Sequence, residues 1–355
     1  MESSTAVITE AEGIKQKWDQ LKKQNPKMRS REIANRLGIS EAELLASSCD
    51  GFKVIRLKND WEGIFQRLHN LGALMALTRN NAAVHEKYGI YQNISFRGHA
   101  GLVLDDQIDL RVLHKRWAFC FAVSVEKARS TLHSLQFFNK SGTAVHKIYL
   151  KDHSNLELFR KLANNFKSAN QSATVAVDDS VKQNGYAEIE HIETDAFLDE
   201  WSALRDTHDF FPLLRKFKLR RTDALKIAKE KYSWKISNNS TLQMLKMASK
   251  DQVPIMVFVR NSGMIQIHTG PVHTIKVIAD WINILDPEFN LHLRSDLIDS
   301  SWIVEKPTKD GIVTSLELFD QQGEQIATFF GARKPGKKEL DGWRQITLKL
   351  KQQNC

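Results

Sequence analysis

The sequence predicts an α+β protein built as a tandem duplication, each half being a large antiparallel sheet with flanking helices. Two observations predict this fold. The spacing of apolar residues changes from helical to strand-like within each half, and the succession of helices and strands starts again past the middle of the chain. Identical residues also recur at a fixed shift of 181 positions, as in Arg79 and Arg260 or Gly89 and Gly270. The same shift relates Asn80, Leu104, Asp105, Leu110, Ser134, Leu135, Phe138 and Gly142 to Asn261, Leu285, Asp286, Leu291, Ser315, Leu316, Phe319 and Gly323.

The first half begins with helices. One helix is expected from Ile14 to Gln24, and residues 30–48 indicate two helices joined by a tight turn at Gly38. A further amphipathic helix starts at Trp61, and a closing helix is expected over residues 155–168. The expected strands are residues 73–80, 98–105, 108–113, 116–125, 133–139 and 144–151, with a hairpin turn at 139–142.

Residues 169–185 are rich in Ser, Asn, Gln and Asp, as a linker would be, which gives predicted repeats over 14–168 and 186–352. In the second repeat, residues 201–232 and 241–249 are expected to be helical, and residues 343–351 to form a closing helix. The expected strands are residues 254–261, 263–270, 275–285, 288–294, 301–307, 312–320 and 325–331.

Composition is typical of a soluble globular protein, with 42% hydrophobic and 26% charged residues. No apolar run approaches the roughly 20 residues that span a bilayer, and the N-terminus lacks the succession of a secretion signal. We therefore expect a cytoplasmic protein without membrane insertion. The cysteines, Cys49, Cys120 and Cys355, form no CxxC pair, which argues against a disulfide scaffold and the usual zinc or iron–sulfur spacings.

The net charge of +9 indicates an anionic partner. Nucleic acid, a phosphorylated molecule and the two carboxylates of haem all satisfy this condition. Charge alone does not choose among them.

Residues 201–221 form a stripe of aromatic and aliphatic residues that contains His208. At helical spacing, Trp201, Leu204, His208 and Phe211 share one face. Such a histidine is either a core residue bonded to backbone carbonyls or an axial ligand of haem iron. The second interpretation needs apolar walls and cations for the propionates. The nearby cations are Arg215, Lys216, Lys218, Arg220 and Arg221.

The run RDTHDFFPLLRKFKLRR (205–221) resembles the segment that carries the proximal ligand in the bacterial HemS/ChuS/HmuS family of cytoplasmic haem-utilisation proteins. Other segments resemble that family in the same order, from about Trp18 to Trp343. They are LTRNNAAVHEKYG (77–89), GHAGLVLDDQIDLR (98–111), SLQFFNKSG (134–142), WIVEKPTKDGIVTSLELF (302–319) and FFGARKPG (329–336).

The resemblance implies haem b as the ligand, with His208 as its axial ligand and Arg111 on the distal face. A guanidinium there stays charged and can donate hydrogen bonds. The resemblance also implies that Arg221, Lys306 and Arg333 bind the propionates. His85 matches a histidine proposed in some relatives as a ligand at a second site.

Two positions depart from the family pattern. Phe330 stands where many relatives have tyrosine, so a phenol hydrogen bond near the haem is lost and a drier pocket is expected. Asp209 replaces a common glutamine next to His208. If Asp209 accepted a hydrogen bond from the imidazole, it would make His208 a stronger iron ligand.

The function predicted first is a cytoplasmic haem-binding protein that takes up imported haem for transfer, storage or iron release. Its partners would be an inner-membrane haem importer or a downstream acceptor. The alternative is a haem-degrading oxygenase in which Arg111 is catalytic and an external reductase supplies electrons, because the chain has no GxGxxG turn at a strand-to-helix junction.

A second alternative is a DNA-binding regulator, which the helix-turn-helix pattern of residues 30–48 suggests. In the second repeat the turn glycine is replaced by Lys218 and the preceding helix carries His208. Two packed helices explain the first copy more simply, so nucleic acid is not the expected partner.

Overall fold

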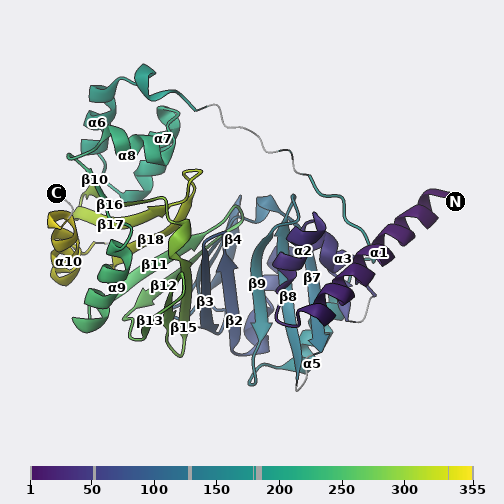
Figure 1. The fold of residues 1–355 in the computed structure, drawn as a ribbon. Coiled ribbons are helices and arrows are strands. Elements are labelled where there is room, and N and C mark those ends of the chain that lie inside the picture. Colours follow the sequence, from purple (N-terminus) through teal and green to yellow (C-terminus); the bar gives the residue numbers. More distant parts are fainter. Residues whose placement is uncertain are drawn as a thin grey trace. The chain divides into compact units, whose positions relative to one another are not determined.

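The computed structural model describes residues 2–50, 53–126, 130–178, 180, 186–334 and 336–353, with side chains from residue 11 onward. These residues form two antiparallel sheets of nine strands each, flanked by helices (Figure 1). The predicted α+β class is therefore confirmed.

The chain divides into two compact units. The first consists of residues 1–78, 87–181 and 261–265, and the second of residues 79–86, 182–260 and 266–355. The units thus follow the expected halves except for two short exchanged segments. The repeat boundaries themselves stay a prediction.

In the first unit, strands β1, β7, β8, β9 and β2 are neighbours in that order, and β6, β5 and β4 form a second run. Its helices are α1 (Glu2–Gln24), α2 (Ser30–Leu37), α3 (Glu41–Ala46), α4 (Trp61–Phe65), η1 (Leu68–Leu71), η2 (His114–Arg116) and α5 (Leu156–Asn165). Its strands are β1 (Val54–Arg56), β2 (Leu74–Arg79), β4 (Ile94–Arg97), β5 (Ala100–Leu104), β6 (Asp109–Val112), β7 (Trp117–Glu126), β8 (Thr131–Asn139) and β9 (Ala144–Leu150).

The second unit repeats this order, with neighbours β10, β16, β17, β18 and β11 and a second run of β15, β14 and β13. Its helices are η3 (Ile189–His191), α6 (Thr194–Ser202), η4 (Thr207–Asp209), α7 (Phe210–Lys216), α8 (Arg221–Ile227), α9 (Ser240–Lys250), η5 (Ser295–Leu297) and α10 (Asp341–Gln352). Its strands are β10 (Ser233–Ile236), β11 (Ile255–Arg260), β13 (Ile275–Ile278), β14 (Trp281–Leu285), β15 (Phe289–Arg294), β16 (Ser300–Thr308), β17 (Gly311–Phe319) and β18 (Gln325–Gly331). Strands β3 (Ala83–Gly89) and β12 (Met264–Gly270) complete the two sheets.

Equivalent turns show the duplication in atomic detail. The Asn80 side chain accepts hydrogen bonds from the backbone N–H groups of Ala82 and Ala83. The Asn261 side chain accepts the same pair of bonds from Gly263 and Met264. The shift of 181 residues therefore relates two identical hairpin turns, β2–β3 and β11–β12.

The two faces of the second-unit sheet have different partners. Leu316 and Leu318 of β17 point into a core shared with α9 and α10. Because side chains alternate along a strand, Ser315 and Glu317 point to the opposite face. On that face, Trp302 and Val304 of β16 pack in a second core with residues of α6, α7 and α8. These three helices group together in Figure 1.

Three expectations about secondary structure are wrong in detail. Residues 201–232 are not one continuous helical stretch, because α6, η4, α7 and α8 are separate pieces. Residues 275–285 form two paired strands, β13 and β14, because Ala279 adopts a left-handed backbone conformation and reverses the chain. The strands β1, β3, β4 and β10 were not expected.

The described part of the predicted linker, residues 169–178 and 180, contains no helix or strand. It is nevertheless attached to the first unit. The Gln171 side chain accepts a hydrogen bond from the Arg56 backbone N–H at 3.0 Å and donates one to the Arg56 carbonyl at 2.8 Å. Residues 179 and 181–185 of the linker lie outside the described residues.

The helix-turn-helix pattern corresponds to α2 and α3, with Gly38 in the left-handed conformation between them. All residues of α3 except Glu43 are buried. A recognition helix must present an exposed face to the DNA groove, and α3 has none to present. This burial favours the interpretation of α2 and α3 as two packed helices.

No helix in the described part of the chain is both long and apolar enough to cross a membrane.

Candidate functional site

His208 lies in the loop between α6 and α7, on the one-turn helix η4. Asp206 accepts a hydrogen bond from the His208 backbone N–H at 2.8 Å, and Asp209 accepts one from the Asp206 N–H at 2.9 Å. These reciprocal bonds form a capping box that fixes the loop. The His208 side chain is 93% exposed. The shared face expected for Trp201, Leu204, His208 and Phe211 is therefore wrong, because the chain is not helical between α6 and η4. The interpretation of His208 as a core residue is also wrong, because its side chain is exposed.

One ring nitrogen of His208 is already engaged. Its Nδ1 lies 2.6 Å from the Asp206 carboxylate. The bonds from the His208 backbone and imidazole keep the pKa of Asp206 below its usual range. In a neutral imidazole whose Nδ1 donates its proton to this carboxylate, the lone pair is on Nε2. This arrangement is typical of metal-ligating histidines, whose second nitrogen is held by a carboxylate.

The acceptor is Asp206. The sequence had instead suggested Asp209. The Asp209 carboxylate is engaged by the backbone N–H groups of Arg205 and Asp206. The capping box therefore determines which acid meets the imidazole.

Arg333 reaches the same loop from the end of β18. Its Nη2 lies 3.4 Å from the Asp310 carboxylate in the β16–β17 turn, and its charge also lowers the pKa of Asp206. The Arg333 Nε is buried and has no hydrogen-bond partner among the described residues. The backbone bond from Lys309 to Arg205, 3.0 Å long, attaches the β16–β17 turn to the His208 loop.

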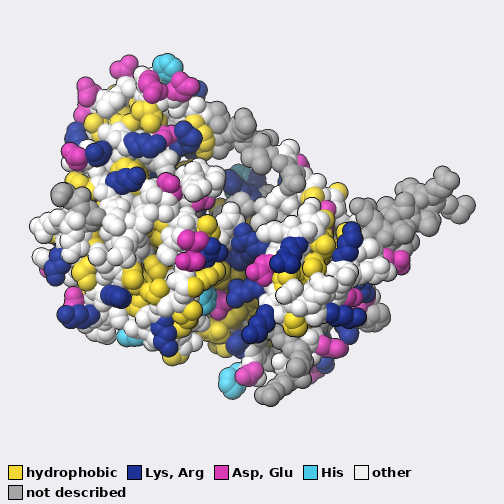
Figure 2. Space-filling model, in the orientation of Figure 1, with side chains coloured by type: hydrophobic (Ala, Val, Ile, Leu, Met, Phe, Trp, Pro, Cys, Tyr) yellow, Lys and Arg dark blue, Asp and Glu magenta, His cyan; other side chains and the backbone are white. Residues whose placement is uncertain are grey.

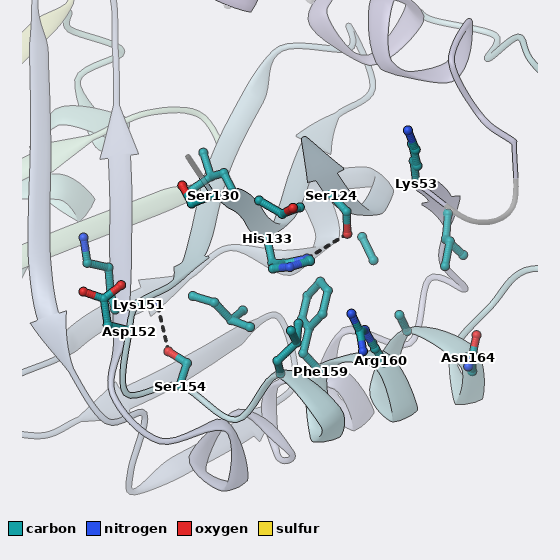
Figure 3. A pocket seen from close by; sticks show the side chains of 17 residues that line it. Lys53, Ser124, Ser130, His133, Lys151, Asp152, Ser154, Phe159, Arg160 and Asn164 are labelled. Atoms are coloured by element: carbon teal, nitrogen blue, oxygen red, sulfur yellow. Dashed lines mark hydrogen bonds between the residues drawn. The ribbon is translucent and has the colours of Figure 1, made fainter. Parts of the chain in front are cut away.

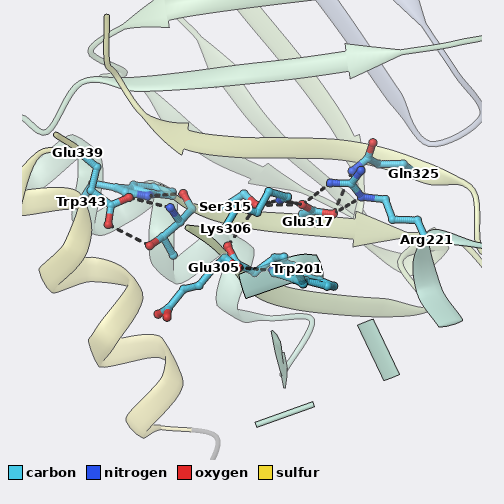
Figure 4. A network of polar contacts seen from close by, with 11 residues as sticks. Trp201, Arg221, Glu305, Lys306, Ser315, Glu317, Gln325, Glu339 and Trp343 are labelled. Atoms are coloured by element: carbon cyan, nitrogen blue, oxygen red, sulfur yellow. Dashed lines mark hydrogen bonds and ion pairs between the residues drawn. The ribbon is translucent and has the colours of Figure 1, made fainter. Parts of the chain in front are cut away.

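Arg221 and Lys306 meet at a buried carboxylate, Glu317 (Figure 4). The Arg221 guanidinium donates two hydrogen bonds of 2.6 Å to Glu317, and the Lys306 Nζ donates one of 3.0 Å. Ser315 donates a further bond to Glu317 at 2.9 Å, and Gln325 donates one at 3.2 Å. We call these five residues the Glu317 cluster.

The Glu317 cluster carries one excess positive charge. Burial alone would raise the pKa of Glu317, but Arg221 and Lys306 outweigh burial and hold that pKa well below its usual range. Burial lowers the pKa of Lys306 to about 8, although Glu317 opposes the shift. At neutral pH, two cations therefore face one anion.

Phe210 connects the cluster to His208. Its ring centroid lies 4.9 Å from the Arg221 guanidinium carbon and 5.0 Å from the Lys306 Nζ. Phe210 is the first residue of α7, two positions after His208. Figure 2 shows Lys and Arg side chains over the surface of the helices α6, α7 and α8.

Apolar side chains complete the surroundings. Phe211, three positions after His208, is 58% exposed, which is unusual for a phenylalanine. Phe330 on β18 is half-buried, pairs in register with Ser315 of the Glu317 cluster and packs edge-on against Phe258 at 5.3 Å. The second unit thus brings His208, Arg221, Lys306, Arg333 and Phe330 around α7 and the strands β16–β18.

The two remaining predicted residues have other surroundings. Arg111 on β6 of the first unit is partly buried and forms an ion pair with Asp109. His85 on β3 is fully buried, with its ring centroid 4.8 Å from that of Phe289. No group of three or more His, Cys, Asp or Glu side chains that could hold a metal ion occurs within the described ranges.

Sequence reasoning missed Asp206, Asp310 and Glu317. Asp206 and Asp209 have the spacing of a capping box, which could have indicated that the loop is not helical. Glu317 stands on the inward face of an apolar strand, where an acid indicates a buried ion pair. Nothing in the sequence marks Asp310.

Comparisons with known proteins show the family to which this chain belongs. The family profile described as the haemin-degrading HemS/ChuX domain matches the chain twice, over residues 38–166 and 218–350. The hemin transport protein HmuS of Yersinia pestis is 37% identical over 337 residues, which cover 94% of this chain and 96% of HmuS. The hemin transport protein HemS of Yersinia enterocolitica is also 37% identical, over 96% of this chain and 98% of HemS.

Solved structures give the same result. Holo-PhuS, a heme-binding protein from Pseudomonas aeruginosa, superposes with a TM-score of 0.94 at 40% identity, covering 96% of this chain and 99% of PhuS. The heme-degrading enzyme ChuS of Escherichia coli O157:H7 superposes with a TM-score of 0.88 at 35% identity, covering 96% of this chain and 99% of ChuS. Two family matches within one chain also agree with the duplication. This chain therefore belongs to the HemS/ChuX domain family.

Proposed function

We propose that this protein binds haem b through His208 as a cytoplasmic carrier that takes up imported haem for transfer, storage or iron release. The observation that carries the proposal is the position of the His208 ring. Its Nδ1 lies against Asp206, so the opposite nitrogen, Nε2, is the one that can ligate iron on this exposed side chain. Neutral imidazole nitrogen is the donor that haem iron takes from histidine.

The surrounding residues fit the shape and charge of such a ligand. Phe211 offers an exposed aromatic surface next to His208 for an apolar macrocycle. Arg333 offers a buried Nε without a partner among the described residues, which suits a propionate. Arg221 already uses two donors on Glu317. Lys306 is 2% exposed, so we propose that it acts through its charge rather than by direct contact.

The other two residues rest on family resemblance. We propose Arg111 as the residue on the distal face, where its permanent charge would donate hydrogen bonds. His85 as a ligand at a second site would require its ring to leave the core, since it is fully buried.

Degradation of the ligand is the alternative function. Bound haem would supply redox-active iron and would also be the substrate. Arg111 would then donate hydrogen bonds on the reacting face, and an external reductase would supply the electrons. As a carrier, the protein would instead meet an inner-membrane importer or a downstream haem acceptor.

The test is a haem titration of the purified apo-protein, followed through the Soret band. We expect a saturable one-to-one spectrum for the wild type and its loss in His208→Ala. His191→Ala removes another exposed histidine of the second unit and serves as the matched control, with an unchanged spectrum expected. Equal weak, non-saturating spectra for wild type and His208→Ala would overturn the proposal.

The same samples separate carrier from enzyme. Ascorbate or a reductase is added under air, with catalase present to remove peroxide. A stable Soret band supports the carrier. Bleaching with release of iron supports the degrading alternative.

A further inference from the structure

A cavity of about 890 Å³ lies between α5 and the face of the first-unit sheet (Figure 3). Its apolar lining includes Ile55, Leu132 and Phe159, and its cationic lining consists of Lys53, Lys151 and Arg160. Asp152 is the acid in the lining. The proposed haem ligation assigns nothing to this cavity.

Two polar groups face each other inside the cavity. The His133 Nδ1 lies 2.8 Å from the Ser124 Oγ. Arg160 rises from α5 toward these residues in Figure 3. His133 and Arg160 both line the cavity, and burial and then the charge of Arg160 lower the pKa of His133. Arg160 forms no hydrogen bond or ion pair with any residue that the structure describes.

The second unit has the same layout, in which α10 takes the place of α5. The buried positions of α5 and the residue after it, Phe159, Leu162, Ala163 and Phe166, have the same spacing as Trp343, Ile346, Thr347 and Leu350 of α10. This alignment places Arg344 at the position of Arg160. The shift of 181 places Thr314 at the position of His133.

In the second unit, the chain itself fills this space. The Glu339 carboxylate accepts hydrogen bonds from the Thr314 N–H at 2.7 Å and the Thr314 hydroxyl at 2.9 Å, and it lies 3.4 Å from the Arg344 Nε. The Trp343 indole donates to the Thr314 carbonyl at 2.9 Å. An aromatic ring and a carboxylate therefore occupy the place beside the arginine.

The first unit cannot fill the space in the same way. Residues 332–340, between β18 and α10, carry Glu339, whereas the connection from β9 to α5 is only residues 151–155. The aromatic position is taken by Phe159, which is smaller than Trp343. The cavity is thus the space that the shorter connection leaves beside an arginine with no carboxylate partner in the described chain.

We propose that this cavity binds a small aromatic carboxylate, whose carboxylate lies between Arg160 and His133 where Glu339 lies in the second unit. The aromatic body then packs on Phe159 and the apolar lining, as the Trp343 ring packs in the second unit. Lys151 adds positive charge at the rim, whereas the charge of Lys53 is paired with Glu126 at 2.9 Å. The inference is independent of haem binding.

Indole-3-acetate is the probe, because it combines an indole ring with a carboxylate on a short arm. Binding is measured by calorimetry and by the shift of the His133 imidazole resonances. Indole-3-acetamide is the neutral control ligand. Arg160→Leu removes the cation, and Lys161→Leu is the matched control, since Lys161 is exposed on the same helix but does not line the cavity.

We expect saturable binding of indole-3-acetate that shifts the His133 resonances. The amide, and separately Arg160→Leu, should weaken binding by about tenfold or more, whereas Lys161→Leu and His208→Ala leave it unchanged. Absence of saturable binding would overturn the proposal, as would equal binding of acid and amide or equal effects of the two leucine variants. If Arg160→Leu does not fold, the comparison of acid and amide on the wild type decides.

Discussion

The two copies of the duplicated unit place different charges on the same scaffold. In the first copy, α3 begins with Glu41, which forms a buried ion pair with Lys147 at 3.2 Å. In the second copy, α8 begins with Arg221, which binds Glu317 together with Lys306. The first arrangement is neutral, and the second has one positive charge in excess.

The positions behind this difference can be matched. At the shift of 181, Glu317 corresponds to Gln136 and Lys306 corresponds to Val125. The helices α2 and α7 begin at residues 30 and 210, so His208 corresponds to Met28, which is only 8% exposed. The apolar residues that build the sheets are shared, whereas the residues proposed to bind haem stand at positions where the copies differ. The scaffold therefore tolerates a change of charge at these positions.

The largest effect on stability is expected from removal of the buried anion. Glu317→Gln gives the second copy the residue of the first copy and leaves the buried Lys306 and the partly exposed Arg221 without their carboxylate. We expect a loss of about 3 to 5 kcal/mol in the free energy of unfolding, because breaking a buried ion pair strands the remaining charge. Urea unfolding measures it.

Gln136→Ala is the control in the first copy. It removes one neutral hydrogen bond to Ser134, so we expect a loss of about 1 kcal/mol. Adding Lys306→Val to Glu317→Gln should restore part of the stability, since one stranded cation is gone. Equal losses for Glu317→Gln and Gln136→Ala would contradict the view that charge distinguishes the copies.

The charge of Lys306 should also make the stability of the second copy depend on pH. The folded pKa of Lys306 is about 8 and its ordinary value is 10.5, so the unfolded state binds more protons between these values. Stability contributed by this position therefore rises with pH across that window. Relative to Lys306→Met, the wild type should gain up to about 3 kcal/mol between pH 8 and 10.5.

Unfolding of both proteins in urea at several pH values gives the difference. Other titrating groups cancel, because they are the same in both proteins. A difference that stays flat, or that falls with rising pH, would show that Lys306 is not held in a lowered-pKa environment.

The next effect concerns the imidazole itself. Asp206→Ala removes the acceptor that holds Nδ1, so we expect haem affinity to fall by about 10- to 100-fold while ligation through His208 persists. Soret titration measures it. Asp195→Ala, an exposed acid on α6, is the matched control and should change nothing. Equal affinities in both variants would remove Asp206 from the site.

The smallest expected effect on stability concerns two turns, the one between α2 and α3 and the one between α7 and α8. Gly38 and Lys218 both adopt left-handed backbone conformations, with φ of 68° and 53°. Lysine is strained there, so Lys218→Gly should stabilise the protein by about 0.5 to 1 kcal/mol. Gly38→Ala should destabilise it by a similar amount, since a Cβ at Gly38 meets no atom within 4 Å and only the backbone conformation resists. Melting temperatures of the two variants should shift in opposite directions.

Much of the fold could be predicted from the sequence, because apolar and polar residues alternate along the long strands and because the shift of 181 positions reveals the duplication. The failures have physical reasons. β1 and β10 span only residues 54–56 and 233–236, too short for a pattern to emerge. Within residues 275–285 the chain reverses direction at Ala279. No Gly or Pro, the residues that usually mark a turn, stands there.

The residues of the candidate site were named from the sequence, but their arrangement in space could not be predicted from it. The histidine stripe marked His208, yet helical periodicity gave it the wrong face, because Asp206 and Asp209 end the helical geometry before it. Resemblance supplied Arg221, Lys306 and Arg333. Glu317, which holds two of these cations, lies 96 residues from Arg221 in sequence, and only the folded sheet brings them together.

The loop around His208 could be transferred to other positions by protein engineering. Its capping box and its imidazole–carboxylate pair are all made within residues 205–209. A segment that carries its own geometry is portable. Grafted into an exposed loop of the first copy, it should present the same ring, and a protein with two such loops would be a simple scaffold for building bivalent metalloporphyrin receptors.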